Sequence, residues 1–322
     1  MSHPTLEDVA ARAGVSRALV SLVMRGSPKV GKERREAVLK AADELGYRPN
    51  VMARGLAAGR TGMAGVLAAD LHDPSFASVH DGLADEAARR GVRLLLASGG
   101  GRPARERAAL GELLDLRLDG LVLAGPRIAA AEIERAAAGC PVAVAGRPLR
   151  SAGVDCVTGD DAAAVRLAVT RLAELGHRRI ACLNVGRSRL EKAFETAVGE
   201  AGLTAVGDPR WRSPGAPTAV LALGDVTGTA ALTGLYRAGL DVPGEVSLIV
   251  HGDAPGAAAA GVTTVAAPAA ELGRLAMAAL LDRIDGGVSG VSGGGGGAAG
   301  EGRRVTVPPV LTERATTGAL TP

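Results

Sequence analysis

The amino-acid sequence predicts an α/β protein with an all-α helix-turn-helix head, a hinge helix, and a two-lobed, doubly wound core with parallel sheets. Three observations lead to this prediction. The first sixty residues contain three short amphipathic helix patterns separated by glycines. After them, short continuous apolar runs alternate with amphipathic stretches, which is typical of parallel strands covered by helices on both faces. This alternation restarts after about residue 160, which indicates two lobes.

The first two predicted helices form the head's central motif. Thr5 and Asp8 have the form of a capping box, so a helix is expected to begin at Leu6. Gly14 ends it, because glycine adopts positive φ at little cost. Ser16 can cap a second helix that runs to about Met24. Two short helices joined by a tight glycine turn predict a helix-turn-helix, whose second helix fits the major groove of B-DNA.

A third helix is expected from about Lys32 to Leu45, ended by Gly46. The side chains expected to face the first two helices are Val38, Leu39, Ala42 and Leu45. Pro49 prevents the helix from continuing, and Asn50 can cap one or two further turns. A helix this short is marginal alone because nucleation is costly, so we expect it to form only when DNA and a partner chain hold it.

The core elements follow from the alternation of apolar runs and amphipathic stretches. In the first lobe, strands are expected at 64–69, 92–97, 120–124 and 142–145, and helices at 75–90, 103–116 and 129–138. In the second lobe, strands are expected at 179–183, 219–223 and 246–250, and helices at 162–175, 189–201 and 226–238. A ligand is expected in the crevice at the carboxyl ends of these strands.

Charge and composition narrow the class of protein. Residues 1–60 carry eleven Lys/Arg against six Asp/Glu, a net charge of +5, whereas the remainder has a net charge of −2. A basic head is what binding to a polyanion requires. The amino terminus is polar and no apolar run can span a bilayer, so we expect a cytoplasmic protein with no membrane contact. Three cysteines without metal-like spacing suit a reducing cytosol.

The whole chain resembles a repressor of the LacI/GalR (lactose/galactose repressor) family. The motifs that carry the resemblance are Thr5-Leu6-Glu7-Asp8-Val9-Ala10, Gly14-Val15-Ser16-Arg17, Leu45-Gly46-Tyr47-Arg48-Pro49-Asn50, Ala53-Arg54-Gly55-Leu56-Ala57, Leu175-Gly176-His177-Arg178-Arg179-Ile180-Ala181, Val242-Pro243 and Val246-Ser247. The resemblance implies a periplasmic-binding-protein-like core that is homodimeric. It also implies that the chain crosses between the lobes near Asp160, Ala267 and Val307.

The resemblance also implies the domain boundaries. The expected parts are a DNA-binding head at 1–49, a hinge helix and linker at 50–61, an N-terminal lobe of the effector and dimerisation core at 62–160 and 268–307, and a C-terminal lobe at 161–267 and 308–322. Within the first lobe, 286–302 is a Gly/Ser/Ala tract with five consecutive glycines from Gly293. No Lys-Ser or Lys-Thr follows it, so we interpret it as a flexible insert rather than a phosphate loop.

The family pattern implies a set of DNA contacts in the head and hinge. The candidate residues are Thr5, Ser16, Arg17, Ala18, Ser21, Leu22, Tyr47, Asn50, Ala53, Arg54 and Leu56. Arg17 and Ala18 lie where side chains reach base edges, and an Arg can donate two hydrogen bonds to guanine O6 and N7. The alternative is that Arg17 lies on solvent or a phosphate. Ser16, Ser21 and Tyr47 resemble groups that contact phosphates and carry no sequence information.

Two of these candidates are special cases. Leu22 departs from the family pattern, where an Arg is common, and an apolar side chain there would sense a thymine methyl or nothing. Leu56 resembles the family's wedge, which enters the minor groove at the operator centre and bends the duplex. The alternative is that Leu56 only packs on its own domain.

The resemblance is weaker at the effector crevice. The candidate contacts are Phe76, Arg147, Asp160, Arg189, Asp225 and Asp253. Where the family usually carries polar side chains, this chain has Gly224, Gly252 and Leu190. The stretch 204–217 is also short, as though a strand and a helix were missing. The pocket is therefore expected to be rebuilt for another ligand or no longer used.

The leading interpretation is a homodimeric transcription regulator, most simply a repressor, that binds double-stranded operator DNA at a pseudo-palindromic site and takes a small-molecule effector of unknown identity. One alternative is a solute-binding protein, against which the basic head and the missing export signal argue. A second is a two-lobed sugar or nucleotide enzyme, but no nucleophile, base or metal cluster supports it. No cofactor is expected. The five histidines are scattered, and His177 is interpreted as structural.

Overall fold

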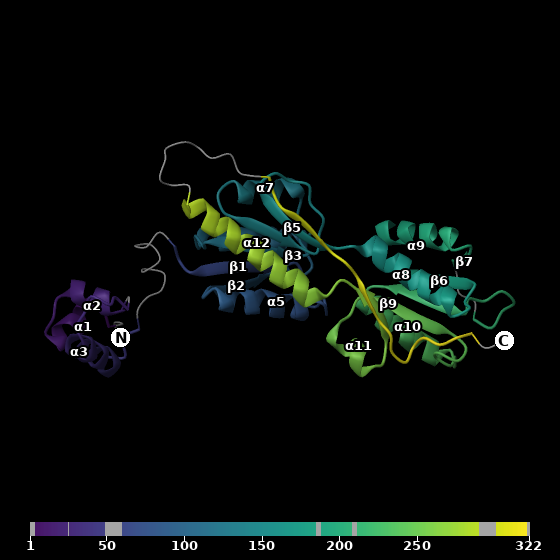
Figure 1. The fold of residues 1–322 in the computed structure, drawn as a ribbon, viewed down its shortest axis with the longest axis horizontal. Helices are drawn as coiled ribbons and strands as arrows, with labels where there is room; N and C mark the ends of the chain where they lie inside the picture. Colours follow the sequence, from purple (N-terminus) through teal and green to yellow (C-terminus); the bar gives the residue numbers. More distant parts are fainter. Residues whose placement is uncertain are drawn as a thin grey trace. The chain divides into compact units, whose positions relative to one another are not determined.

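The computed structural model describes residues 4–24, 26–48, 60–184, 188–207, 211–289 and 301–320 (Figure 1). The chain divides into two compact units, residues 1–61 and 62–322. Within the described part, no helix is both long and apolar enough to cross a membrane. The expectations for Asn50, Ala53, Arg54 and Leu56 in the hinge lie outside the described residues.

The head consists of α1 (Leu6–Ala13), α2 (Arg17–Met24) and α3 (Lys32–Glu44). The predicted capping box is confirmed: Asp8 N donates to Thr5 Oγ1 at 3.3 Å, and Thr5 N donates to Asp8 Oδ2 at 2.7 Å. Gly14 ends α1 with φ of 64°, as its position in the sequence predicted. The three helices and their boundaries therefore follow the sequence pattern to within one residue.

The core of the head is small and aliphatic. Its buried side chains are Val9, Ala10, Val20, Val23, Val30, Val38, Ala41 and Ala42. The prediction that Leu39 faces inward is wrong, because its residue is 49% exposed. Val38, Ala41 and Ala42 share one face at three- and four-residue spacing, and Leu39 is turned about 100° away from Val38 around the helix.

The first sheet of the core has the strand order β11-β5-β4-β3-β1-β2, and its neighbouring strands are all parallel. Its strands are β1 (Met63–Ala68), β2 (Arg93–Ser98), β3 (Gly120–Ala124), β4 (Val142–Ala145), β5 (Val154–Gly159) and β11 (Arg304–Val307). Its helices are α5 (Phe76–Arg89), α6 (Pro103–Asp115), α7 (Ala130–Ala137) and α12 (Ala269–Ser289). One apolar cluster joins the sheet to α6 and α7, and a second joins it to α5 and α12.

The second sheet has the strand order β12-β10-β9-β8-β6-β7, parallel except where β12 pairs with β10. Its strands are β6 (Arg179–Asn184), β7 (Thr204–Val206), β8 (Ala219–Leu223), β9 (Ser247–His251), β10 (Thr263–Ala266) and β12 (Val310–Thr312). Its helices are α8 (Asp161–Glu174), α9 (Ser188–Glu200), α10 (Asp225–Arg237) and α11 (Pro255–Ala259). The chain passes between the sheets after β5, after β10 and after β11.

The structure also contains elements that the sequence analysis did not predict, namely β5, β10, β11, β12, α11 and α12. Two regions on which it made a prediction differ from that expectation. The strand thought to be missing from 204–217 is present, because β7 pairs with β6 in a register that sets Thr204 beside Arg179. The described residues between β7 and β8 contain no helix, as expected. Near the glycine tract, α12 extends to Ser289, so the first four residues of the expected flexible insert are helical.

His177 is a buried structural residue, as the sequence analysis interpreted it, and it links three segments of the second lobe. Its ring is 1% exposed, with Nδ1 3.0 Å from Thr218 Oγ1 and Nε2 3.0 Å from Ser247 Oγ. Gly318 O lies 3.2 Å from the same Nε2. Burial lowers the pKa of His177, so the neutral ring is favoured in the fold.

Candidate DNA-binding and effector sites

The first turn of α2 is the most exposed part of the helix-turn-helix. Ser16, Arg17 and Ala18 all lie on the surface. Ser16 Oγ accepts a hydrogen bond from Leu19 N at 3.3 Å, so its hydroxyl caps α2 and fixes where the helix begins. The Arg17 side chain is 67% exposed, and its Nη1 lies 3.4 Å from Glu7 Oε1 on α1. The guanidinium can leave this surface pair and reach a base edge or a phosphate.

The remaining described head candidates are more involved in the fold. Leu22 and Tyr47 are half-buried and pack against the head core, and Ser21 is also half-buried. Thr5 is exposed, but its hydroxyl donates to Asp8 Oδ2 at 2.8 Å. Hydrogen bonds from the backbone and side chain of Thr5 lower the pKa of Asp8, so the cap stays ionised.

The six effector candidates all follow the carboxyl end of a strand, where parallel sheets bind ligands. Phe76 follows β1, Arg147 follows β4, Asp160 follows β5, Arg189 follows β6, Asp225 follows β8 and Asp253 follows β9. The first three belong to the first sheet and the last three to the second. The structure therefore brings the candidates to the expected edge of each sheet.

Three of these side chains are occupied by local structure. Asp160 Oδ1 accepts from Ala163 N at 2.9 Å and caps α8. Arg147 Nη1 donates to the backbone oxygens of Pro126 and Ile128 at 3.1 and 2.5 Å. Asp253 Oδ1 accepts from Thr264 Oγ1 at 2.8 Å and from Arg314 Nη2 at 3.1 Å. Their polar groups are thus largely committed before any ligand enters.

The start of α9 carries Leu190 at the position where the family pattern implies a ligand-binding Arg. Leu190 is 6% exposed and packs in the same apolar cluster as Phe194. Arg189 lies on the surface instead. Phe76, half-buried at the start of α5, packs against the apolar cluster that joins the first sheet to α5 and α12, and its ring centroid lies 6.1 Å from that of His80. The described start of α9 therefore turns Leu190 into the core and Arg189 to the surface.

Asp225 is the most perturbed acidic group among the candidates. Burial raises the pKa of its carboxyl, a hydrogen bond from Ala254 N to Oδ1 at 2.9 Å opposes the rise, and Asp73 and Asp253 add to it. His251 acts in the opposite direction. A half-buried carboxylate beside two other carboxylates carries an unfavourable charge, which is typical of a binding site rather than of a structural residue.

Gly252 is required by the position of Asp225. Its φ is 138°, and a Cβ built on it would lie 2.6 Å from each of the three carboxyl atoms of Asp225. No side chain fits there while that carboxylate occupies its position. Gly224 likewise has a φ of 115°. Gly252, which stands where the family usually carries a polar residue, thus leaves room for the Asp225 carboxylate.

Two residues that the sequence analysis left unassigned lie beside Asp225. His251 is 8% exposed, and its Nε2 lies 3.5 Å from Asp161 Oδ1. Its Nδ1 is buried and has no hydrogen-bond partner in the part of the chain that the structure describes. Asp73 is the other residue, in the loop after β1. The sequence could have indicated His251 by its position, because it is the last residue of an apolar strand and such strand ends bind ligands.

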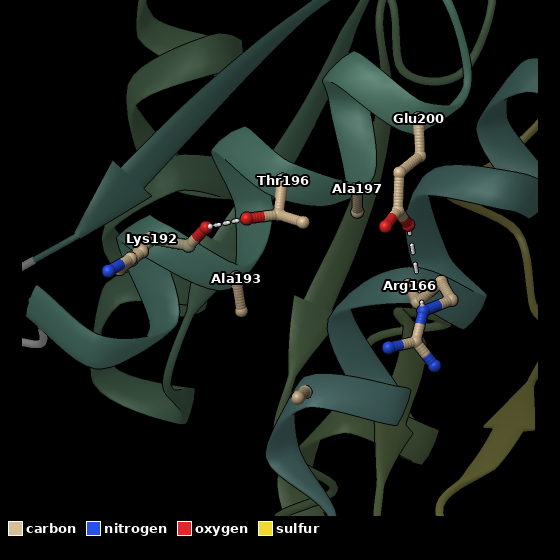
Figure 2. Close-up of a pocket in the computed structure, with 7 residues that line it drawn as sticks. Arg166, Lys192, Ala193, Thr196, Ala197 and Glu200 are labelled. Carbon is tan, nitrogen blue, oxygen red and sulfur yellow. Dashed lines mark hydrogen bonds and ion pairs between the residues drawn. The ribbon is translucent and has the colours of Figure 1, made fainter.

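A shallow cavity of about 180 Å³ lies elsewhere, between the exposed sides of α8 and α9 (Figure 2). Its lining residues are Ala162, Arg166, Lys192, Ala193, Thr196, Ala197 and Glu200. Arg166 Nε lies 4.0 Å from Glu200 Oε2, and Thr196 Oγ1 donates to Lys192 O at 2.9 Å. It contains none of the candidate residues. Nor do the described residues contain a group of three or more side chains suited to holding a metal ion.

Comparisons with known proteins agree with this arrangement of parts. A family model of bacterial regulatory proteins of the lacI family matches residues 5–50. A model of periplasmic binding proteins and the sugar-binding domain of the LacI family matches residues 61–214, and a periplasmic binding protein-like domain matches residues 169–317.

Curated relatives match most of the chain. The HTH-type transcriptional regulator GalR of Escherichia coli is 32% identical over 274 residues, which cover 77% of this chain and 79% of GalR. The HTH-type transcriptional regulator CelR of Thermobifida fusca is 34% identical over 282 residues, covering 78% of this chain and 82% of CelR.

Solved structures agree with the fold. A complex of transcriptional regulator CelR with cellobiose superposes with a TM-score of 0.65 at 28% identity, covering 97% of this chain and 99% of that chain. The lac repressor dimer bound to operator and an anti-inducer has a TM-score of 0.80 over 99% of this chain and all of that chain. At 22% identity, this second likeness concerns the fold alone.

Proposed function

Because the chain belongs to the lacI family of bacterial regulatory proteins and is a DNA-binding transcription regulator rather than an enzyme, we propose that it represses transcription as a homodimer on a pseudo-palindromic operator. One head covers one half-site, so two-fold symmetry in the protein calls for two-fold symmetry in the DNA. Its place of action is then the bacterial cytoplasm, where double-stranded operator DNA is found.

The observation that carries the proposal is the exposed first turn of α2. Arg17 is the candidate for reading a base, since its guanidinium is held only by a surface ion pair with Glu7. Ser16 and Ser21 are candidates for phosphate contacts, together with Tyr47. The net charge of +5 over residues 1–60 supplies the sequence-independent part of the affinity.

The proposal assigns roles to the other parts of the chain. Residues 1–49 bind the major groove, and residues 50–61 bind the minor groove, with Leu56 as the wedge and Ala53 and Arg54 beside it. The two lobes, 62–160 with 268–307 and 161–267 with 308–322, join two copies of the chain. They also take a small-molecule effector at the carboxyl ends of their strands.

The test is a binding-site selection with the full chain and a random duplex library. We expect an inverted repeat whose half-sites lie about one helical turn apart, bound by two chains. Arg17→Ala should flatten the base preference at one position in each half-site, a loss of roughly 1–3 kcal/mol of discrimination. Arg34→Ala is the matched control, because Arg34 is an exposed Arg of α3 outside the proposed reading face.

Two results would contradict the proposal. One is a monomer that binds a single half-site with the affinity of the full site in sedimentation and footprinting experiments. The other is an Arg17→Ala selection that returns the parent's sequence preference.

A further inference from the structure

The effector site assumed in the proposed function has an acidic and hydrogen-bond-accepting character. Asp225 follows β8, Asp253 follows β9, Asp161 begins α8, and Asp73 reaches the same region from the first lobe. The ends of β5, β8 and β9 thus present carboxylate oxygens, which accept hydrogen bonds and donate none when ionised.

Two cationic side chains near this site, Arg314 and Arg147, are already engaged. Arg314 donates from Nη2 to Asp253, and from Nη1 to Val262 O at 2.6 Å and Thr264 Oγ1 at 2.9 Å. Arg147 donates from Nη1 to two backbone oxygens of the loop after β3. Among the described residues, Ala254 N is the one hydrogen-bond donor that reaches the Asp225 carboxylate, and it engages Oδ1 only. None of the described residues donates a hydrogen bond to Asp225 Oδ2.

His251 adds a second, independent unmet group. Its ring is nine-tenths buried at the carboxyl end of β9, close enough to Asp225 to lower the pKa of that carboxyl. Its Nε2 lies 3.5 Å from Asp161 Oδ1, and its Nδ1 is buried and has no hydrogen-bond partner in the described part of the chain. A buried polar atom without a partner is costly.

The carboxylate oxygens of this site accept hydrogen bonds, so a ligand that fits them is rich in donors. Resting on the proposed function, we propose that the effector site at the carboxyl ends of β8 and β9 takes a small organic cation, a primary or secondary amine, whose ammonium group binds Asp225.

The alternatives fit these groups less well. A protonated primary amine has three donors and no acceptor, and its hydrogen bonds to a carboxylate are charge-assisted. A neutral sugar would leave the repulsion among Asp225, Asp73 and Asp253 in place, and an anion would increase it. Asp73 of the first lobe adds to the pKa rise that burial causes at Asp225, so a cation bound at Asp225 is attracted by carboxylates of both lobes. Such a cation favours the arrangement in which the lobes approach each other, which is how an effector would alter the dimer.

Thermal denaturation of the full chain in cacodylate buffer, which contains neither an amine nor phosphate, and without DNA, tests the proposal. The probes are two pairs of similar shape and different charge: glucosamine against glucose, and putrescine against 1,4-butanediol. We expect at least one amine to raise Tm at millimolar concentration or below, and its neutral counterpart to leave Tm unchanged. Equal shifts within a pair, a response only to glucose or butanediol, a response to Mg²⁺ or Ca²⁺ in place of the amines, or no shift at all would overturn the proposal.

Variants locate the site. Asp225→Asn keeps the size and an acceptor for Ala254 N but removes the charge, and should weaken amine binding at least tenfold in calorimetry. Asp73→Asn should weaken it less. Asp115→Asn, at the exposed end of α6, is the control with the same change of charge. A cooperative melt of each variant shows that it is folded, and unchanged amine affinity in Asp225→Asn would overturn the assignment.

The two proposals can fail separately. Operator binding by the ligand-free parent tests the proposed function alone, whereas the thermal shift by amines requires no DNA. Amine binding by a chain that selects no operator would reject the repressor and leave the amine site standing. Operator binding with no amine response would reject the amine site and leave the proposed repressor function standing.

Discussion

At two proposed binding residues, Arg17 and Asp225, charged groups of the protein itself already interact with the side chain that would bind the ligand. Glu7 lies 3.4 Å from Arg17, the residue proposed to read a base, and both side chains are about two-thirds exposed or more. Asp225 is held against Gly252, and burial together with the nearby carboxylates of Asp73 and Asp253 raises the pKa of its carboxyl. When the ligand binds, the ion pair between Glu7 and Arg17 must break, and the repulsion between Asp225 and its neighbouring carboxylates decreases. Substitutions that remove the competing charge therefore have predictable effects.

Glu7→Gln should strengthen DNA binding about two- to fivefold at low salt. The exposed ion pair contributes roughly 0–1 kcal/mol, which the free protein loses when Arg17 moves to the DNA. The gain should disappear at high salt, because exposed charges are screened. Titrations of a labelled operator at two salt concentrations measure the effect. Glu33→Gln, in the first turn of α3, changes the net charge of the head equally, so an equal gain there would remove the specific role of Glu7.

Asp225→Asn should raise the Tm of the ligand-free protein by a few degrees at pH 7. Burial raises the pKa of Asp225 above its unfolded value, so its stabilising contribution is present below the unfolded pKa. That contribution is lost as the pH rises through the folded pKa, so the ionised form is a cost at neutral pH. The advantage of the variant should shrink in acid, as melts between pH 4 and about pH 7 would show. A variant less stable than the parent at pH 7 would contradict this sign.

At the scale of elements, the sequence predicted the strands that are marked by a continuous run of apolar residues. β3, β4 and β8 are continuous apolar runs, and their predicted bounds match the structure. β5 was missed because it carries Asp155, which is 1% exposed. The Arg283 guanidinium neutralises its carboxylate, donating from Nε and Nη2 at 2.8 and 2.7 Å. The backbone N of Arg303 donates a further hydrogen bond to Oδ1 at 2.8 Å. These partners lie 128 and 148 residues away, so no local pattern reveals that a charged residue belongs in a buried strand.

The packing of α12 on α5 is a second feature that sequence periodicity does not reveal (Figure 1). A Cβ on Gly82 would lie 1.8 Å from Ala270 O, and a Cβ on Gly273 would lie 2.0 Å from Val79 O. Each helix therefore uses a glycine to let the other backbone approach. Glycine inside a helix costs about 1 kcal/mol relative to Ala, which here is offset by the close packing of the two helices.

Gly273→Ala should therefore destabilise the core by about 1–3 kcal/mol, even though Ala favours the helix, because the two backbones must separate. Gly234→Ala is the matched control. Gly234 is an exposed glycine of α10 with open space around its Cβ position, so this change should stabilise the protein by up to about 1 kcal/mol. Urea denaturation of both variants measures the difference. Equal stabilisation by the two substitutions would show that the helices do not depend on this close approach.

At the scale of the whole molecule, the sequence predicted the parts better than the chemistry of the effector site. Capping residues, glycines and apolar periodicity are local, and they located the head and most of the alternating core. The effector site is assembled from the ends of separate strands and from both lobes. Asp73, Asp161, Asp225 and His251 come together only through the sheet topology. Gly252, which the sequence analysis counted as the loss of a polar side chain, makes room for the Asp225 carboxylate in the structure.

The division into two units predicts how the full chain unfolds. The head has a core of eight small aliphatic side chains and forms a compact unit separate from residues 62–322. A domain this small buries a low fraction of its surface, so we expect it to melt first and independently. Calorimetry of the full chain should show a small early transition and a larger later one.

Each ligand should then act on its own transition. Operator DNA at about 100 times its Kd stabilises the form that binds it by roughly 2.7 kcal/mol, which for a domain of this size corresponds to a rise in Tm of about 10 °C or more in the early transition. An amine that binds at Asp225 should raise the later transition and leave the early one unchanged in the absence of DNA. The matched duplex with a scrambled half-site is the control for nonspecific binding. One transition, moved equally by both ligands, would mean that the head and the core unfold as a single cooperative unit, and the division of labour between them would be wrong.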